Sequence, residues 1–190
     1  MSTLTKIILV CLGLVLIVGA WLGTGYNSLV RLQEGVTTAF ADLDAQYQRR
    51  MDLIPNIVAT VKGSAKFEAS TLEAVVAARS AWATAKSNGN MSGQLNAAGS
   101  FDSALSRLLV TVEAYPELKS TQAFRDLTVT LEGSENRIAV ARRDYNAAVQ
   151  SYNLRTKQFP SNLVASWFGF NSATFFQAQT GAAQAPVVSF

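Results

Sequence analysis

Apolar residues recur every three or four positions along almost the whole chain, and no stretch alternates with a period of two. A spacing of three to four places apolar side chains on one face of an α-helix, whereas a half-buried strand alternates. The pattern therefore predicts an all-α protein of long helices, and it contains no sign of a sheet.

The N-terminal part differs from the rest because it is apolar on every side. Between Lys6 and Arg31 the chain has no charged residue, and residues 7–22 are almost all Ile, Leu, Val, Gly and Ala. About 20 apolar residues, each rising about 1.5 Å, are enough to cross a bilayer. We predict a flank over residues 1–6 and a transmembrane helix over residues 7–26.

Four residues near the end of this run are candidates for contacts inside the membrane. Trp21 and Tyr26 lie where amphipathic rings favour the headgroup boundary. Gly19 and Gly23 form a GxxxG pair, which lets two transmembrane helices approach closely. We expect these residues to contact lipid or a second copy of the chain.

A cleaved signal peptide is the alternative to a permanent anchor. Lys6 would form its basic start, residues 7–17 its apolar stretch, and residues 18–20 its cleavage site. However, apolar residues at three- and four-residue spacing resume over residues 29–43, with no proline before them. One helix is therefore predicted to leave the membrane and continue into the body.

The body, residues 27–160, is divided into further helices by a few breaks. Asp52 and Pro55 predict a helix start, as an N-cap and a first-turn proline. The turn-forming residues 87–93 end that helix, Pro116 ends the next, and Pro160 ends the last. The apolar stripes of these three helices are Ile54, Ile57, Val61, Ala65, Leu72, Val75 and Trp82, then Phe101, Leu105, Leu108, Val112 and Tyr115, then Phe124, Leu127, Leu131, Ser134, Ile138, Ala141, Tyr145, Ala148, Tyr152, Arg155 and Phe159.

The last of these helices is unusually long. Its stripe implies about 38 residues, or about 57 Å at 1.5 Å per residue, and five heptads in register are typical of a coiled-coil-like seam. Another long helix has to cover such a stripe. We expect the continuation of the first helix to be its partner, which gives a bundle of about four helices.

The tail, residues 161–190, is aromatic and uncharged; no charged residue occurs after Lys157. Exposed aromatic rings at this density are difficult to keep soluble. Either they pack back on the bundle or they contact lipid headgroups or a neighbouring subunit. The candidates for such contacts are Trp167, Phe168, Phe170, Phe175 and Phe176.

Composition narrows the possible functions. Charged residues make up 15% of the 190 residues and hydrophobic ones 49%, the net charge is +3, and no basic stripe is present, so nucleic-acid binding is not expected. The chain has no histidine and a single cysteine, Cys11, which excludes a structural zinc site, an intramolecular disulfide and a histidine-based triad. Val10 before Cys11 disfavours a lipoprotein, and we interpret Cys11 as a core thiol. We predict a non-enzymatic protein without cofactor or metal.

One pair of carboxylates has two possible interpretations, a cation- or proton-binding site and ordinary ion pairing along a helix. Glu132 and Glu135 lie one turn apart, with Asp144 further along, and paired carboxylates bind divalent cations or share a proton. Ordinary ion pairing along a helix explains them better. The available partners are Arg125, Arg137 and Arg142.

Four sequence motifs are more specific than a generic bundle. They read RRMDLIPN over residues 49–56, EAYPELK over 113–119, ENRIAVAR over 135–142 and FPSN over 159–162. Together they resemble the motifs of the bacterial LemA family, over about residues 26–162. The uncharged aromatic tail departs from that pattern. The motif residues that we single out are Arg49, Arg50, Asp52, Pro55, Asn56, Tyr115, Pro116, Glu135, Arg137, Arg142, Tyr145, Asn146, Tyr152 and Asn153.

Physical roles can be given to these residues without catalysis. Arg49 and Arg50 end a helix where cations complement the carbonyl dipole, and a proline after Tyr115 stops a helix. Tyr145 and Tyr152 lie one heptad apart, and each is followed by an asparagine that can bond across helices and fix register.

The resemblance implies a single-pass protein of the bacterial inner membrane with an antiparallel helical bundle and no established catalytic activity. Members are linked to membrane organisation, including a branch associated with magnetosome membranes, and often lie beside genes for a phosphatase-like membrane domain. Lys6 before the span and only Arg31 close behind it favour a body outside the cytoplasm, by about one charge. We expect a self-associating scaffold; the alternative is an adaptor or sensor that docks a protease or phosphatase-like membrane protein.

Overall fold

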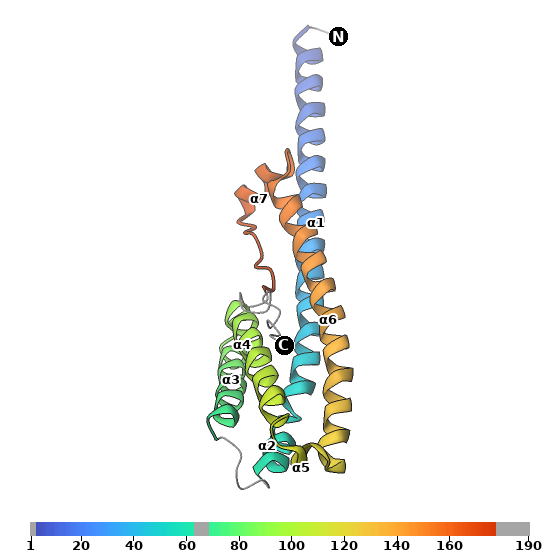
Figure 1. Cartoon of the computed structure of the whole chain (residues 1–190). Coiled ribbons are helices and arrows are strands. Elements are labelled where there is room, and N and C mark those ends of the chain that lie inside the picture. The colour runs from blue at the N-terminus through green and yellow to red at the C-terminus, as the bar shows by residue number, and fades with distance from the viewer. Residues whose placement is uncertain (1–2, 63–68, 178–190) are drawn as a thin grey trace, which may run out of the picture. The chain divides into compact units, whose positions relative to one another are not determined.

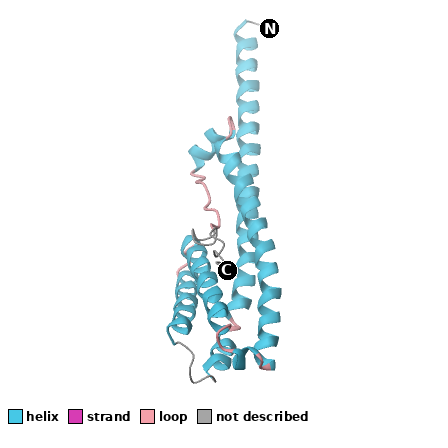
Figure 2. Ribbon diagram, in the orientation of Figure 1, coloured by secondary structure: helices cyan, strands magenta, loops and turns pink. Residues whose placement is uncertain are grey.

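The computed structural model describes residues 3–62 and 69–177, and every regular element in these ranges is a helix (Figures 1 and 2). The prediction of an all-α protein is confirmed. The helices are α1 (Thr3–Met51), α2 (Ile54–Lys62), α3 (Ala69–Ser87), α4 (Met91–Val112), α5 (Pro116–Lys119), α6 (Gln122–Lys157) and α7 (Ser161–Phe168).

The chain forms two compact units. The first combines residues up to Phe40 with residues 144–175, and the second combines residues 41–143 with the described residues from Phe176 onward. Helices α1 and α6 contribute residues to both units.

Helix α1 contains 49 residues and runs without a break from the apolar N-terminal stretch into the body. The predicted continuation of one helix is therefore confirmed. Its most apolar stretch is long enough to cross a membrane, and none of that stretch is buried in the protein. Cys11 lies in this stretch and is exposed. Our interpretation of Cys11 as a core thiol is wrong, because none of the described helices covers that part of α1.

The first unit has a small core between α1 and α7. Leu29 of α1 is fully buried against Val164 and Ala165 of α7. Close approach is possible because Gly25 faces Val164: a Cβ atom at position 25 would lie only 3.3 Å from the Val164 side chain. Phe40 of α1 contacts the ring of Tyr145 in α6, with 5.9 Å between the ring centroids.

The second unit is built around α3 and α4, which lie side by side (Figure 1). The predicted stripes supply its buried residues, because apolar residues at three- and four-residue spacing share one helix face. In α1, α2 and α3 they are Leu43, Ile54, Ile57, Val61, Leu72, Val75 and Trp82; in α4 and α6 they are Phe101, Leu105, Leu108, Val112, Phe124, Leu127, Leu131 and Ile138.

Three details of the helix boundaries differ from the sequence prediction. The stretch expected as one helix after Pro55 contains two, α2 and α3, and the predicted core residue Ala65 lies outside the described residues. Phe159 is 80% exposed and does not extend the α6 stripe, because α6 ends at Lys157. Asp52 is not the N-cap of α2: the carbonyl of Leu53 accepts the first N–H groups, from Asn56 and Ile57.

The turn before α4 and the start of α5 contain the residues that the sequence predicted at helix boundaries. Gly89 adopts a φ of +64°, a conformation that favours glycine, and Asn90 caps α4 by accepting the N–H of Gly93 at 2.8 Å. Pro116 follows the turn after α4 and is the first residue of α5, where its missing N–H costs nothing.

Candidate functional site

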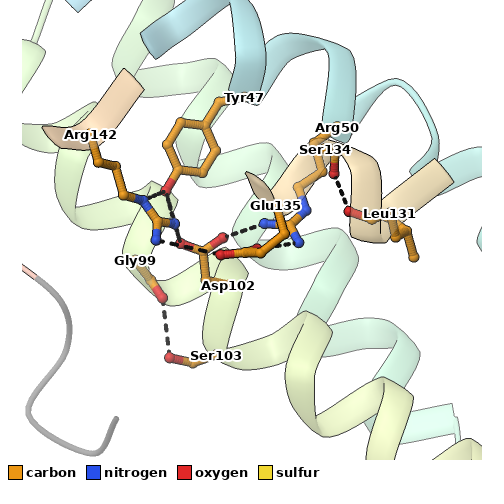
Figure 3. A network of polar contacts seen from close by, with 9 residues as sticks. All are labelled: Tyr47, Arg50, Gly99, Asp102, Ser103, Leu131, Ser134, Glu135 and Arg142. Carbon is orange, nitrogen blue, oxygen red and sulfur yellow. Dashed lines mark hydrogen bonds and ion pairs between the residues drawn. The ribbon is translucent and has the colours of Figure 1, made fainter. Parts of the chain in front are cut away.

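The most distinctive polar feature of the chain is a network around Asp102 of α4, within the second unit (Figure 3). The Asp102 carboxylate accepts the Tyr47 hydroxyl at 2.8 Å and Nη1 of Arg50 at 3.0 Å. It also accepts Nη2 of Arg142. The three donors come from two helices, α1 and α6, so one carboxylate joins α1, α4 and α6.

Glu135 of α6 adds a second carboxylate to the network. Its Oε2 lies 2.6 Å from Nη2 of Arg50, and its Oε1 lies 3.8 Å from Nη1 of Arg142. Arg142 Nε also donates to the Tyr47 hydroxyl at 3.0 Å. Two guanidinium groups therefore face two carboxylates, and the four charges balance.

Burial makes this network energetically important. Arg50 is only 5% exposed, although arginine is almost never buried unless it is paired. Burial raises the pKa of the Tyr47 phenol well above its ordinary value, and the negative charge of Asp102 raises it further. Burial also raises the pKa of the Asp102 carboxyl, while Arg142, Tyr47 and Arg50 oppose that shift.

The protonation states follow from these contacts. Burial disfavours the charge of Arg142, but Asp102 and Tyr47 outweigh it and raise the Arg142 pKa. The phenol therefore stays neutral and donates, and the guanidinium stays charged. Such a network positions helices relative to one another, because moving any of them would leave a buried charge without its partner. In the described part of the chain, no three acidic or thiol side chains lie close enough to hold a metal ion.

The network brings together residues from two of the sequence motifs. Arg50, Glu135 and Arg142 were singled out in the sequence, and the pairing of Glu135 with Arg142 agrees with the ion-pair interpretation. Arg50 and Arg49 lie in the last turn of α1 as predicted. The sequence reasoning missed Tyr47 and Asp102, since nothing in their local spacing marks them as partners of residues 40 to 95 positions away.

Within the first unit, two motif residues of α6, Tyr145 and Asn153, form hydrogen bonds with the backbone of the tail. Tyr145 donates its hydroxyl to the carbonyl of Thr174 at 2.6 Å. Asn153 forms two hydrogen bonds with the backbone of Ala173: its Nδ2 donates to the carbonyl at 2.9 Å, and its Oδ1 accepts the N–H at 2.8 Å. We expected this asparagine to bond across helices, but its partner is the non-helical segment after α7.

Some of the tail aromatics pack back on the protein. Phe168 and Phe170 meet the ring of Tyr26 edge to face, at centroid distances of 4.9 and 5.6 Å. In the second unit, Phe176 stacks on Tyr47 at 6.2 Å, and the guanidinium of Arg142 lies 4.7 Å from the Phe176 ring centre.

Other predicted contact residues remain on the surface. Trp167 is 75% exposed, and Phe175 and Trp21 are also exposed. A Cβ atom added at Gly19 or Gly23 would meet nothing within 4 Å. The part of the tail after Gln177 lies outside the described residues.

The remaining motif residues differ in their burial. Tyr115 is half-buried, Tyr152 is buried in α6, and Asn146 is partly buried one residue after Tyr145. The others are exposed: Arg49, Asp52, Pro55, Asn56, Pro116 and Arg137.

Comparison with known proteins gives a consistent picture. The family model described as "LemA family" matches residues 39–190. Magnetosome protein MamQ 2 of Paramagnetospirillum magneticum is 28% identical over 187 residues, covering 86% of this chain and 68% of the relative. Magnetosome protein MamQ of Magnetospirillum gryphiswaldense is 25% identical over the same coverage. Protein LemA of Metamycoplasma hominis is 25% identical over 152 residues, covering 80% of this chain and 68% of the relative. The match spans the helices that carry the Asp102 network and the tail-binding residues of α6, and it shows that this chain belongs to the LemA family.

Proposed function

We propose that this protein is a single-pass, membrane-anchored scaffold that self-associates to organise a bacterial membrane or envelope, with its body outside the cytoplasm. The observation that carries the proposal is the continuity of α1, whose uncovered apolar stretch and buried body stripe belong to one 49-residue helix. An apolar helix stretch without protein cover is stable in hydrocarbon and unfavourable in water.

Relatives support the organising role. Three of the matched relatives are named magnetosome proteins. We infer that this chain also acts at a membrane surface through assembly. A non-catalytic role agrees with the Asp102 network, in which each charged group is already occupied by an internal partner.

Self-association is proposed to use the apolar helix. Gly19 and Gly23 leave a shallow strip on α1, and no atom of the described residues lies within 4 Å of a Cβ built at either glycine. In hydrocarbon, small residues four positions apart allow close packing of two helices. A second copy of α1 is the occupant that fits such a strip.

The anchor is tested first by fractionation and by the mass of the mature protein. The full chain should stay with the membrane after alkaline carbonate extraction and should retain residues 1–20. A mature protein that begins at Trp21 and is released by carbonate would refute the anchor, because that is the result of signal-peptide cleavage.

The side of the membrane is tested by labelling. Asn88 lies in the exposed turn between α3 and α4. In a Cys11→Ala background, an Asn88→Cys variant should react with a membrane-impermeant maleimide in intact spheroplasts. Reaction only after lysis would place the body in the cytoplasm.

Assembly is tested by native mass spectrometry after mild detergent extraction and by crosslinking in native membranes. We expect a homo-oligomer with crosslinks between copies. A strictly monomeric particle would refute the scaffold, and stoichiometric crosslinks to one other protein would favour the adaptor or sensor instead.

A further inference from the structure

Helix α7 lies against α1 at the end of its apolar stretch (Figure 1). Val164 of α7 faces Gly25, and Phe168 meets Tyr26 edge to face at 4.9 Å. A hydrocarbon core of about 30 Å corresponds to about 20 helical residues, so a span over residues 7–26 ends at these two positions. The contacts with Gly25 and Tyr26 therefore place α7 at the membrane boundary.

Helix α7 contains three polar residues, Ser161, Asn162 and Ser166, and it has apolar residues on two sides, of which the described residues cover one. The inner side of α7 consists of Ser161, Val164 and Ala165, which are buried within the first unit. On its outer side, Leu163 and Trp167 are four residues apart and therefore share one helix face. Leu163 is 49% exposed and Trp167 75% exposed. Leu163 and Trp167 therefore form a small apolar patch that no described part of the chain covers.

The charges around α7 match a lipid surface. No charged residue occurs from Gln158 to the end of the chain, while Arg155 and Lys157 occupy the last turn of α6 directly before this uncharged stretch. Basic residues next to an apolar patch favour the headgroups of anionic lipids, and tryptophan favours the boundary between headgroups and acyl chains.

We propose that the outer face of α7, formed by Leu163 and Trp167 with the preceding Phe159, inserts into the headgroup region of the same bilayer that α1 crosses. Interfacial helices bury their apolar side about 5–10 Å into this region. The protein would then have two membrane contacts, a spanning helix and a short surface helix held against it. This inference rests on the proposed anchor, and the experiment below separates the two.

The three tryptophans of the chain provide three depth reporters. Trp21 lies in the apolar helix, Trp167 lies on the outer face of α7, and Trp82 is buried in α3. Replacing two at a time by phenylalanine gives three single-tryptophan variants of the full chain. Each is reconstituted into phosphatidylcholine and phosphatidylglycerol vesicles that contain lipids brominated at defined acyl positions, and the quenching of its fluorescence is measured.

We expect Trp167 to lose at least as large a fraction of its emission as Trp21, with the strongest effect from bromine near the headgroup, while Trp82 is unaffected. Quenching of Trp21 without quenching of Trp167 would overturn the α7 proposal and leave the anchor standing. Absence of quenching at both would overturn the anchor itself. Trp167 shielded from lipid, with crosslinks between copies through Trp167→Cys, would identify a second chain as the occupant and also overturn the proposal.

A charge on the outer face provides the matched test. Leu163→Asp in the Trp167 reporter should abolish most of the quenching, while Val110→Asp, at a similarly exposed apolar position of α4, should leave it unchanged. Hydrogen exchange over residues 161–168 should stay as in the parent chain, which shows that α7 remains folded. Unchanged quenching in Leu163→Asp would contradict insertion of this face.

Discussion

At the residue scale, the most consequential group is the carboxylate of Asp102. It faces two guanidinium groups and a phenol that are partly or fully removed from water, and its removal would leave them without a common acceptor. Forming such a network and breaking it have different effects on stability. A complete buried network contributes little net stability, whereas loss of one partner costs several kcal/mol.

Replacing Asp102 by asparagine should therefore destabilise the protein. We expect the free energy of unfolding to fall by about 3 kcal/mol, because Arg50 and Arg142 lose their shared negative partner. Urea denaturation of the full chain in detergent measures the change. Glu132→Gln removes an exposed carboxylate of α6 as a control and should change stability by no more than about 0.5 kcal/mol. Equal effects of the two substitutions would show that the network does not contribute as described.

Because the protein contains buried tyrosines, we expect its free energy of unfolding to fall at alkaline pH. Burial raises the pKa of Tyr47, Tyr145 and Tyr152 in the folded protein, whereas an unfolded tyrosine titrates near pH 10. Above that pH the unfolded chain releases protons that the folded chain retains, so unfolding becomes more favourable as pH rises. Thermal melts across the alkaline range should show this decline, and Tyr47→Phe should make it shallower. A decline of the same steepness in Tyr47→Phe would contradict the assignment.

At the element scale, the helices owe their positions to a few contacts that the periodic pattern does not contain. Helix α7 reaches α1 because Gly25 has no side chain. The segment after α7 has no regular structure, and its backbone groups at Ala173 and Thr174 are satisfied by α6 side chains. Asn153 and Tyr145 therefore hold the backbone of this segment, and Asn153 makes two of these three hydrogen bonds.

Asn153→Ala should release the segment after α7. The substitution removes two hydrogen bonds to Ala173, each contributing about 1 kcal/mol. We expect faster hydrogen exchange over residues 171–177, with exchange in α4 unchanged. Asn153→Asp keeps the acceptor and loses the donor, so its effect should be intermediate. Unchanged exchange in Asn153→Ala would show that other contacts hold the segment.

At the scale of the whole molecule, the apolar stretch of α1 and the residues of α1 that pack in the body belong to one continuous helix, so the proposed association of the apolar stretches would bring the bodies together. The glycine strip of α1 is the proposed contact. The effect of the glycine pair on assembly can be distinguished from a general effect of hydrophobicity. The same apolar stretch contains a further glycine, Gly13, outside the GxxxG pair.

Gly19→Ile with Gly23→Ile should reduce the size of the extracted particle. The added branched side chains keep the segment apolar but prevent close approach of two helices. Native mass spectrometry or light scattering in mild detergent measures the particle. Gly13→Ile is the matched control and should leave the size unchanged. An undiminished particle in the double variant would remove the glycine pair from the assembly contact.

Much of the fold could be predicted from the sequence, because helix formation and burial at three- and four-residue spacing are local properties. Most residues of the predicted stripes are buried, among them Leu43, Trp82 and Val112, and the apolar run does continue into the body helix. Tyr115, the last residue of the third predicted stripe, is half-buried and lies beyond the end of α4. The pattern was less reliable at helix ends: Phe159 continued the spacing but lies beyond the end of α6, where helical register no longer applies.

The sequence by itself thus determined the helical class, the apolar segment and the buried face of each long helix. Only the tertiary structure decided which polar residues meet. Asp102 joins Tyr47 and Arg142, and Asn153 finds the backbone of Ala173, although these partners are 20 to 55 residues apart. Local periodicity records the face on which a side chain lies, but the partner across that face depends on how separate helices pack.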